Sequence, residues 1–295
     1  MSLIIRENVP LAPFISFQVG GPARFFCAPE SPEQFGEALR FARERALPVF
    51  VLGKGTNLVF SDAGFSGLLI FTGEYGRIEW NGSAVRAECG AVLMDVVAQS
   101  VARGFSGMQN LAGIPGTMGG GTYINAGAFE QELKDTITEV VSLRQDGTVM
   151  RRGNAECAFG YRRSLFCEAG EIILETSARL RPGGDSASLR SEMEATLARR
   201  AEKQPLHLPN AGSMFKRPPG KYAGALIEAA GLKGFRMGGA GISEKHANFT
   251  VNLGGAKAQD IWDLTSEVIR RVREHSGITL EREVIFIGEF LPWPR

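Results

Sequence analysis

The chain of 295 residues is longer than one ordinary domain and suits two or three. Its 44% hydrophobic and 22% charged residues are typical of a folded globular protein, and a net charge of +1 excludes the basic surface that nucleic-acid binding requires. No apolar run reaches the roughly 18–20 residues that cross a bilayer, and Arg6, Glu7 and Pro10 stand where a signal peptide would be apolar. We therefore expect a cytoplasmic protein with no membrane or nucleic-acid partner.

The first part of the chain predicts alternating helices and strands. Ser31 and Pro32 are typical of a helix N-terminus, and apolar residues then repeat at helical spacing up to Ala46. An apolar strand at 49–52 leads directly into a glycine-rich turn, Gly53-Lys54-Gly55-Thr56-Asn57. The next expected elements are strands at 68–71 and 85–87 and a helix from 91 to 103, which ends before Gly104.

Between residues 111 and 128 the composition predicts a loop without regular structure. Six glycines fall within fifteen residues there: Gly113, Gly116, Gly119, Gly120, Gly121 and Gly127. Strands are expected to return at 139–144 and 149–152, joined by a turn at Asp146-Gly147. A further strand is expected at 171–180.

The segment from Arg181 to Ser186, with the sequence RPGGDS, is typical of a linker. It divides the chain into a first domain, 1–183, made of two lobes (about 1–68 and 69–183), and a second domain, 186–295. In the second domain we expect helices at 188–203, 222–230 and 260–275, and strands at 247–253 and 280–290. Both domains mix helices and strands, so the predicted fold class is α+β.

The cysteines and histidines give no sign of a metal site. The four cysteines form no C-x-x-C pair, so we expect reduced, buried thiols. The three histidines fit no H-x-x-x-H pattern, so neither zinc nor another metal is expected. These residues are Cys27, Cys89, Cys157 and Cys167, and His207, His246 and His275.

The two glycine-rich segments favour a phosphate-bearing ligand. Backbone N–H groups along such a turn form a concavity that binds anions, because glycine lets the chain approach a phosphate closely. Neither segment has the G-x-G-x-x-G or G-x-x-x-x-G-K-[ST] pattern, so a Rossmann site and a P-loop are disfavoured. The first segment alone is equally consistent with a tight turn after a strand. Two segments together favour a long cofactor that carries phosphates.

Four strings in the first domain resemble the UDP-N-acetylenolpyruvoylglucosamine reductase family. They are 16–23 (SFQVGGPA), 53–60 (GKGTNLVF), 113–120 (GIPGTMGG) and 125–128 (NAGA). The resemblance implies the FAD-binding fold of the vanillyl-alcohol oxidase type, with a C-terminal α+β substrate-binding domain. One departure is Phe129-Glu130-Gln131, where the family often has small residues. The residues implied to bind FAD are Gly53, Lys54, Gly55, Thr56, Asn57, Leu58, Gly113, Ile114, Pro115, Gly116, Thr117, Gly119, Gly120, Asn125 and Gly127.

The string Tyr161-Arg162-Arg163-Ser164 resembles the family's Tyr-Arg-x-Ser motif. An arbitrary arginine would simply pair with a surface carboxylate. The resemblance implies a catalytic role for Arg162, whose planar and permanently charged guanidinium suits a substrate carboxylate that gains enolate character.

Two further strings in the second domain carry the other implied catalytic residues. Ser213, in Asn-Ala-Gly-Ser, sits in no G-x-S-x-G elbow and would by itself be a turn residue; the resemblance implies that it donates a proton to a carbanion. Glu283, in Leu-Glu-x-Glu-Val, would share a strand face with Ile285 and Ile287. A carboxylate with apolar neighbours tends to keep its proton, which suits a proton-sharing partner.

The second domain also contains a basic segment. From His207 to His246, six Lys and Arg residues face two glutamates, a local charge of +4 against +1 for the whole chain. A solvated basic face is the ordinary explanation, but the run at 216–220 (KRPPG) within this segment directly follows the string that contains Ser213, so we predict that the segment binds a substrate diphosphate. The predicted substrate-binding residues are Tyr161, Lys216, Arg217, Lys221, Lys245 and His246.

The resemblance implies an enzyme that uses FAD and NADPH to reduce the enolpyruvyl group of UDP-N-acetylenolpyruvoylglucosamine to UDP-N-acetylmuramate, for peptidoglycan synthesis. About fifty residues separate Arg162 from Ser213, so the inserted tyrosine loop of the longer family members is not expected. We expect a monomer that binds only small molecules. Two alternatives remain at this point: an oxidase or dehydrogenase of the same fold that acts on an alcohol or hydroxy acid, and a non-catalytic nucleotide-binding protein.

Overall fold

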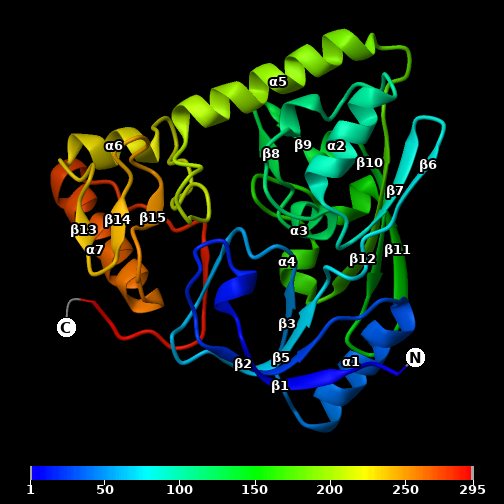
Figure 1. Cartoon of the computed structure of the whole chain (residues 1–295), viewed down its shortest axis with the longest axis horizontal. Coiled ribbons are helices and arrows are strands. Elements are labelled where there is room, and N and C mark those ends of the chain that lie inside the picture. Colours follow the sequence, from blue (N-terminus) through cyan, green and yellow to red (C-terminus); the bar gives the residue numbers. More distant parts are fainter. Residues whose placement is uncertain (1, 294–295) are drawn as a thin grey trace. The chain divides into compact units, whose positions relative to one another are not determined.

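The computed structural model describes residues 2–293, which form two compact units that alternate along the sequence (Figure 1). Of these residues, unit 1 contains 2–6, 26–54 and 67–200, and unit 2 contains 7–25, 55–66 and 201–293. The chain passes between the units within strands β1 (Ile5–Pro10), β2 (Pro22–Cys27) and β5 (Phe65–Phe71). The domain boundaries given by the sequence stay a prediction. Among the described residues, no helix is both long and apolar enough to cross a membrane.

Helix α1 (Pro32–Glu44) begins where the sequence predicts it. The Ser31 hydroxyl accepts a hydrogen bond from the Gln34 backbone N–H at 3.5 Å, and Pro32 occupies the first turn, where the helix needs no N–H donor. The apolar side chains at helical spacing are buried; they are Phe35, Ala38, Leu39 and Ala42. The local sequence signals therefore act together with burial to form this helix.

Strand β3 (Val49–Leu52) confirms the predicted strand and pairs in parallel with β5. The larger sheet of unit 1 has the strand order β11-β10-β12-β7-β6, and every neighbouring pair of its strands is antiparallel. Helix α3 (Met118–Tyr123) packs against β12 and β7 of this sheet (Figure 1). The bounds are β6 Ile78–Asn81, β7 Ala84–Glu88, β10 Ile137–Leu143, β11 Val149–Gly153 and β12 Ile172–Arg179, with α2 at Leu93–Ala102.

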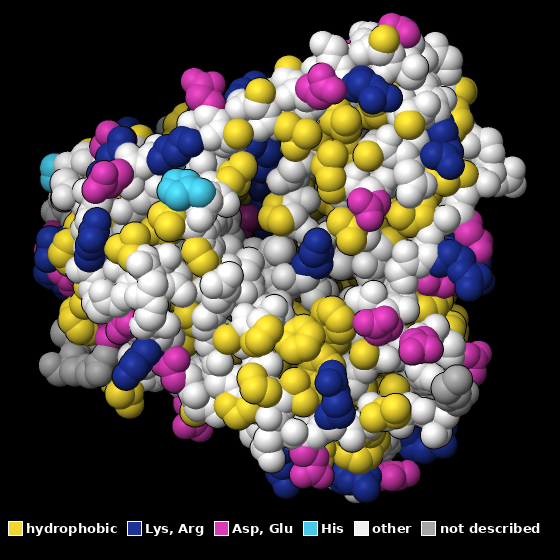
Figure 2. All heavy atoms as spheres, viewed as in Figure 1, with side chains coloured by type: hydrophobic (Ala, Val, Ile, Leu, Met, Phe, Trp, Pro, Cys, Tyr) yellow, Lys and Arg dark blue, Asp and Glu magenta, His cyan; other side chains and the backbone are white. Residues whose placement is uncertain are grey.

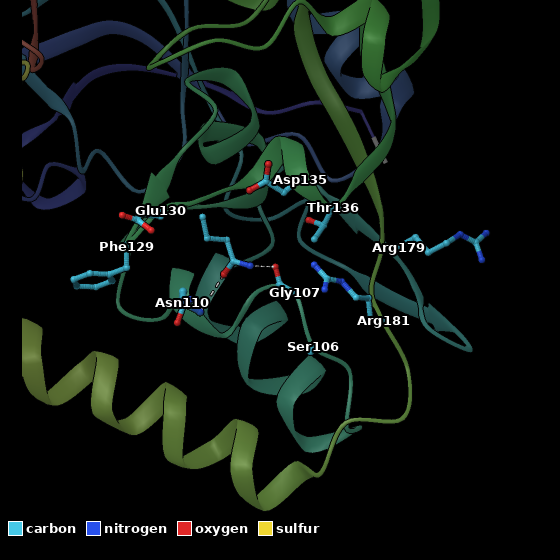
Figure 3. Close-up of a pocket in the computed structure, with 10 residues that line it drawn as sticks. Ser106, Gly107, Asn110, Phe129, Glu130, Asp135, Thr136, Arg179 and Arg181 are labelled. Carbon is cyan, nitrogen blue, oxygen red and sulfur yellow. Dashed lines mark hydrogen bonds between the residues drawn. The ribbon is translucent and has the colours of Figure 1, made fainter. Parts of the chain in front are cut away.

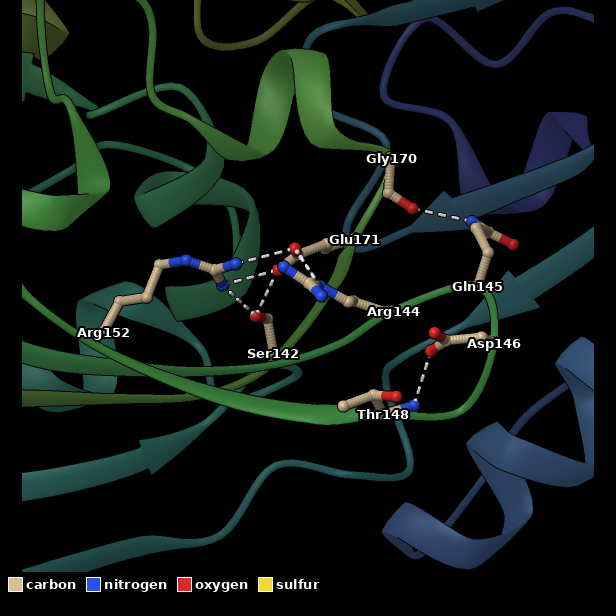
Figure 4. Close-up of polar contacts among 8 residues, drawn as sticks. All are labelled: Ser142, Arg144, Gln145, Asp146, Thr148, Arg152, Gly170 and Glu171. Carbon is tan, nitrogen blue, oxygen red and sulfur yellow. Dashed lines mark hydrogen bonds and ion pairs between the residues drawn. The ribbon is translucent and has the colours of Figure 1, made fainter.

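A buried ion pair joins three neighbouring parts of this sheet (Figure 4). Arg152 on β11 binds the carboxylate of Glu171 with two hydrogen bonds, at 2.6 and 2.8 Å, and the Ser142 hydroxyl on β10 donates to the same carboxylate at 2.6 Å. Burial acts to raise the pKa of Glu171, but the hydrogen bonds from Arg152, Ser142 and Arg144 more than offset it, so this pKa lies below its ordinary value. Such a pair adds little net stability, but removing one partner would leave an uncompensated buried charge.

The expectation of an irregular loop between 111 and 128 is wrong, because this segment contains helix α3 (Met118–Tyr123). The Thr117 hydroxyl caps the helix by accepting from the Gly120 N–H at 3.2 Å. The backbone N–H groups of Met118 and Gly119 bind the carbonyls of Ala91 and Cys89, at 2.8 and 2.9 Å. Tertiary hydrogen bonds thus overcome the poor helix propensity of three consecutive glycines.

One long helix and several short elements complete unit 1. The long helix, α5 (Ser186–Lys203), confirms the predicted helix at 188–203, although its last three residues belong to unit 2. Cys27, Cys89 and Cys157 are free and buried, as predicted, and Cys167 is partly exposed. The remaining short elements are η2 Gln109–Leu111, β8 Gly127–Ala128, β9 Gln131–Glu132, η3 Leu133–Asp135, η4 Asn154–Cys157 and α4 Phe166–Ala169.

Unit 2 is built on the sheet β13-β14-β15, with helix α7 packed against β13 and β14 (Figure 1). The buried face of α7 (Ala258–Ser276) contains Ile261, Leu264, Val268 and Val272, at the spacing of one helix face. The predicted helices at 222–230 and 260–275 are therefore confirmed. The other bounds are η1 Ala12–Phe14, α6 Ala223–Ala229, β13 Arg236–Met237, β14 Ala240–Ile242 and β15 Thr250–Asn252.

The predicted strand at 280–290 is wrong over most of its length. Only β16 (Ile285–Ile287) is a strand, and it pairs in parallel with the equally short β4 (Leu58–Phe60). Glu283 lies before this strand, so simple alternation does not place it on a face with Ile285 and Ile287. The position of Glu283 follows instead from the hydrogen bonds described below.

Candidate functional site

The first glycine-rich turn is divided between the two units, and within each unit its glycine is packed closely against other residues. In unit 1, a Cβ atom on Gly53 would lie 2.8 Å from Thr117 Oγ1, so the first turn begins against the second glycine segment. In unit 2, Gly55 has φ +60°, and a Cβ there would lie 2.2 Å from the Phe14 carbonyl oxygen. Within residues 2–293, no acceptor takes the backbone N–H groups of Gly53, Lys54 or Gly55. These donors fit a phosphate-bearing cofactor such as FAD.

The second glycine segment uses its glycines for close packing. The N–H of Gly119 donates to the Cys89 carbonyl and that of Gly120 to Thr117 Oγ1, so both amides are already engaged within the protein. A Cβ on Gly119 would lie 2.6 Å from Cys89 Cβ, whereas one on Gly120 would meet only Thr117 Oγ1, at 3.5 Å. Gly119 is therefore needed inside the fold, and Gly120 leaves an open, exposed surface that a cofactor can approach.

Asn125 ties the second glycine segment to the Tyr161–Ser164 segment. Its side chain is fully buried, and its Nδ2 donates to the carbonyl of Gly160 and to Glu132 Oε2, each at 3.0 Å. Its Oδ1 accepts from the Lys134 N–H at 3.0 Å. The amide is thus satisfied by protein groups, and its role in the site is to fix the chain around it.

Arg162 lies directly against the second glycine segment in unit 1. Its Nη2 donates to the Gly127 carbonyl at 3.2 Å, and the Ser164 hydroxyl donates to the Tyr123 carbonyl at 2.6 Å. The backbone of Arg162 has φ +55°, a conformation that non-glycine residues seldom adopt and that is frequent at functional sites. Its guanidinium also lies 5.1 Å from the ring centroid of Tyr161, which is 53% exposed.

Ser213 and Glu283 are brought together in unit 2. The Glu283 N–H donates to the Met214 carbonyl at 2.8 Å, and the Lys216 N–H donates to the Glu281 carbonyl at 2.9 Å. The chain from 213 to 216 therefore runs beside the chain from 281 to 283, in antiparallel direction. Both candidate residues are half-buried, as suits groups that contact a ligand.

Two asparagine side chains support this pair of segments. Asn57, in the part of the first glycine turn that belongs to unit 2, donates its Nδ2 to the Glu283 carbonyl at 3.2 Å. Asn248 binds both backbone groups of Phe215, at 3.0 and 2.9 Å, and its own carbonyl accepts from the Met214 N–H at 2.7 Å. The predicted FAD-binding residue Asn57 thus contacts the strand end that carries Glu283.

The sequence alone did not single out Arg282, which fixes the backbone next to Glu283. Its guanidinium donates to Thr265 Oγ1, Ser266 Oγ and the Trp262 carbonyl, at 2.9, 2.6 and 3.2 Å. It also lies over the rings of Trp262 and Phe286, 4.1 and 5.1 Å from their centroids. Burial lowers the pKa of Arg282 to about 10, so the side chain stays charged at neutral pH.

The predicted substrate-binding residues of unit 2 have different surroundings. Lys216 forms an ion pair with Glu281, the guanidinium of Arg217 lies over the Tyr222 ring at 4.2 Å, and Lys245 donates to the Ala201 carbonyl. Arg217, Lys221 and Lys245 are exposed. On the face shown in Figure 2, Lys and Arg side chains are interspersed with Asp and Glu, as the near-zero net charge implies.

His246 is poorly placed to act as a cation. Burial lowers its pKa, and the nearby charge of Lys233 lowers it further. Its Nδ1 accepts from the Asn248 N–H at 3.2 Å, and its ring packs on Phe249 with centroids 4.9 Å apart. The neutral imidazole is therefore an acceptor and a packing group at neutral pH.

A third feature of unit 1 is a cavity of about 380 Å³ (Figure 3). Ser106, Asn110, Gln131 and Arg181 contribute polar groups to its wall, and Phe129 lies at its edge nearest the helix α5. The Gln131 side chain closes one side by donating to the Gly107 carbonyl at 2.5 Å. None of the predicted site residues lines this cavity.

Comparison with known families first defines the class of protein. The FAD binding domain family matches residues 23–153, which include Gly53 and Arg152 and the whole second glycine segment. The C-terminal domain of UDP-N-acetylenolpyruvoylglucosamine reductase matches residues 204–287, which include Ser213 and Glu283. The protein is a FAD-dependent oxidoreductase, and the predicted FAD-binding fold followed by an α+β C-terminal part is confirmed.

Individual relatives then define the family. The UDP-N-acetylenolpyruvoylglucosamine reductase 2 of Symbiobacterium thermophilum is 43% identical to this chain over 290 residues, which cover 98% of this chain and 94% of the relative. The UDP-N-acetylenolpyruvoylglucosamine reductase of Caldicellulosiruptor bescii is 42% identical over 286 residues, which cover 96% of this chain and 91% of the relative. The crystal structure of the Thermus caldophilus enzyme superimposes with a TM-score of 0.83 at 32% identity, covering 97% of this chain and 100% of that one. The chain belongs to the UDP-N-acetylenolpyruvoylglucosamine reductase family.

Proposed function

We propose that this protein reduces the enolpyruvyl group of UDP-N-acetylenolpyruvoylglucosamine with electrons from NADPH, and so forms UDP-N-acetylmuramate for peptidoglycan synthesis. The observation that carries the proposal is the pairing of Met214 with Glu283. It places a hydroxyl, on Ser213, and a carboxylate, on Glu283, on adjacent segments of one unit. The proposed reaction needs both groups, because a negative charge develops on the substrate and a proton must be delivered to a neighbouring atom.

Each of three side chains has one role in this proposal. Arg162 binds the substrate carboxylate and stabilises its enolate character, because a guanidinium matches a carboxylate with two parallel hydrogen bonds. Glu283 shares a proton with this developing charge. Hydride adds to the methylene carbon of the enolpyruvyl group, and Ser213 gives its hydroxyl proton to the adjacent carbon, which this addition leaves carbanionic. General acid catalysis of this kind contributes about 10²–10⁴-fold in rate. When bound, FAD supplies the hydride that it has taken from NADPH.

The glycine segments bind FAD in this proposal. Gly53, Lys54 and Gly55 offer free backbone N–H groups to the diphosphate, and the open surface of Gly120 lets the cofactor approach the second segment. The packing of Gly53 against Thr117 supports a shared cradle at the start of both segments. Gly113, Ile114, Pro115, Gly116, Asn125 and Gly127 shape the second segment, and Thr56, Asn57 and Leu58 complete the first.

The exposed cations of unit 2 bind the nucleotide part of the substrate. Arg217, Lys221 and Lys245 are free to approach a diphosphate from solvent, whereas Lys216 already pairs with Glu281. His246 contributes no charge, and because its Nδ1 already accepts from the Asn248 N–H, the group that it offers the substrate is the Nε2–H donor. A nucleotide-linked precursor of this kind is a cytoplasmic metabolite, so we place the enzyme in the cytoplasm. That it acts as a monomer stays a prediction.

The test is NADPH consumption by the purified protein. We expect a yellow protein that oxidises NADPH beyond the one equivalent that reduces its flavin only when the enolpyruvyl substrate is added, with one UDP-N-acetylmuramate formed per NADPH turned over. Alcohols and hydroxy acids serve as the control substrates. Rapid flavin reduction by one of these compounds would support an oxidase of the same fold and refute the proposal, as would a colourless protein that binds nucleotides without turnover.

A further inference from the structure

The cavity of about 380 Å³ in unit 1 has no part in the proposed reaction (Figure 3). All of its lining residues belong to unit 1, and its volume lies within the range of about 300–1,000 Å³ that is typical of small-molecule sites. Of the described residues that line it, only Phe129 has an apolar side chain. A ligand in this cavity would therefore be held chiefly by charges and hydrogen bonds.

Arg181 is fixed so that its side chain reaches into the cavity. Its backbone exchanges two hydrogen bonds with Ser106, at 3.0 and 2.9 Å. In Figure 3 its guanidinium points toward Gly107 and Thr136, whereas that of Arg179 points away. Among the described residues, no acceptor binds the Arg181 guanidinium. A guanidinium with open donors matches a carboxylate through two parallel hydrogen bonds.

Two carboxylates share the cavity with Arg181 and form no ion pair with it within residues 2–293. One oxygen of Asp135 accepts from the Glu132 N–H at 2.8 Å, and the other is open. Glu130 has no partner in the described part of the chain, and its φ of +64° is a conformation that non-glycine residues seldom adopt and that is frequent at functional sites. In Figure 3, Asp135 lies between Glu130 and Arg181. Opposite charges that line one cavity without pairing leave room for a ligand that carries both signs.

The signs of these charges exclude two kinds of ligand. A phosphate would be repelled by Glu130 and Asp135, and a simple diamine would be repelled by the inward-pointing Arg181. A ligand with one carboxylate and two ammonium groups matches all three residues, and lysine has this pattern. Phe129 lies beside Glu130 at the edge of the cavity and offers an apolar surface to the methylene groups of such a ligand. The Arg199 guanidinium holds this ring, 3.7 Å from its centroid.

We propose that this cavity binds a free diamino acid such as lysine. Its α-carboxylate binds Arg181, its α-ammonium binds Asp135 and its side-chain ammonium binds Glu130. The site goes beyond the proposed function, because none of these residues contacts FAD or the enolpyruvyl group in that proposal. Glu130 lies in the turn of the β8–β9 hairpin, which also contains Gly127, the residue whose carbonyl accepts from Arg162. A bound amino acid would therefore hold the hairpin that carries this acceptor.

The experiment titrates the purified holoprotein with three related compounds at pH 7, by isothermal titration calorimetry. L-Lysine carries all three charges, L-norleucine lacks the side-chain ammonium, and cadaverine lacks the carboxylate. We expect lysine to bind with a Kd of about 0.1–1 mM, as suits a ligand of about ten non-hydrogen atoms. Norleucine and cadaverine should each bind at least about tenfold more weakly, because each loses one charge-assisted contact.

Three variants at exposed positions assign the contacts with little risk to folding. Arg181→Met should weaken lysine binding about tenfold or more, and should no longer bind lysine more tightly than cadaverine. Glu130→Gln should no longer bind lysine more tightly than norleucine. Arg179→Met is the matched control, because its guanidinium points away from the cavity, and it should bind lysine like the wild type.

Four results would overturn the proposal. The first is the absence of binding by both L- and D-lysine at concentrations up to about 10 mM. The second is unchanged lysine affinity in Arg181→Met, and the third is equal weakening by Arg179→Met, which would indicate unspecific attraction. The fourth is binding of inorganic phosphate that depends on Arg181 while lysine does not bind, which would identify a simple anion site. The titrations need no turnover, so they are independent of the proposed reaction.

Discussion

The two adjacent glycines of α3 should separate the needs of the fold from those of the cofactor. In Gly119→Ala the new Cβ would lie 2.6 Å from Cys89 Cβ, 2.9 Å from its carbonyl oxygen and 3.0 Å from its Cα. Because two of these three atoms are backbone, the strain cannot be relieved by a rotamer change. Overpacking of this kind costs about 1–3 kcal/mol, and the better helix propensity of alanine returns roughly 1 kcal/mol at most.

Gly120→Ala is the matched control for the fold. Its Cβ would meet only Thr117 Oγ1, at 3.5 Å, which is an ordinary contact. The apoprotein should therefore be as stable as the wild type or up to about 1 kcal/mol more stable. If FAD approaches the open surface of Gly120, the added methyl group should weaken FAD binding about tenfold, which corresponds to about 1.4 kcal/mol.

Differential scanning fluorimetry of the apoproteins and FAD titration give the two readouts. For Gly119→Ala we expect a net loss of about 1–2 kcal/mol, and a fall in the apoprotein melting temperature of about 2–8 °C. For Gly120→Ala we expect the reverse pattern, with weaker FAD binding and no loss of melting temperature. A Gly119→Ala apoprotein as stable as the wild type, or a Gly120→Ala protein with unchanged FAD affinity, would refute this division of roles.

Three further predictions concern unit 2. Arg217→Ala should raise KM for the enolpyruvyl substrate and leave flavin reduction by NADPH unchanged; an equal loss in both half-reactions would exclude a role in substrate binding. Arg282→Lys, which keeps the charge but loses the three-way fork, should slow substrate-driven flavin reoxidation about tenfold with little change in KM; unchanged kinetics would make Arg282 irrelevant to Glu283. Hydrogen bonds from Arg270 and Arg271 lower the pKa of Glu267 to about 2. The ionised carboxylate therefore contributes about 2–3 kcal/mol to the free energy of unfolding above pH 4.5, and this contribution is lost as the pH falls toward 2. In urea unfolding, Glu267→Gln should abolish this dependence on acid.

The helices with strong local signals could be predicted from the sequence. Helix α1 has an N-cap serine, a proline in the first turn and a clear apolar face, and all three act within a few residues. Helix α3 could not be predicted, because its glycines oppose a helix locally and its stability comes from Cys89 and Ala91, nearly thirty residues away. The strand at 280–290 failed for a related reason. Its alternating pattern suits a long strand, but its partner β4 offers only three residues for pairing.

The candidate site was likewise only partly predictable from the sequence. The strings around Ser213 and Glu283 were recognisable in the sequence, and the structure places these two residues on adjacent segments. Charge burial was not recognisable, because Arg199 and Arg200 look alike in the sequence and only the fold makes one exposed and the other buried. The same holds for Arg282, whose partners on α7 lie 16 to 20 residues earlier in the chain.

The most direct measurement follows the two half-reactions of Ser213→Ala separately by stopped-flow absorbance. NADPH should reduce the flavin at the wild-type rate, because Ser213 has no part in that step. Reoxidation by the enolpyruvyl substrate should slow by about 10²–10⁴-fold, the usual contribution of a general acid. Ser213→Cys should recover part of the rate, since a thiol can still donate a proton. Substrate-driven reoxidation of Ser213→Ala at nearly the wild-type rate would contradict the assignment of Ser213 as the proton donor.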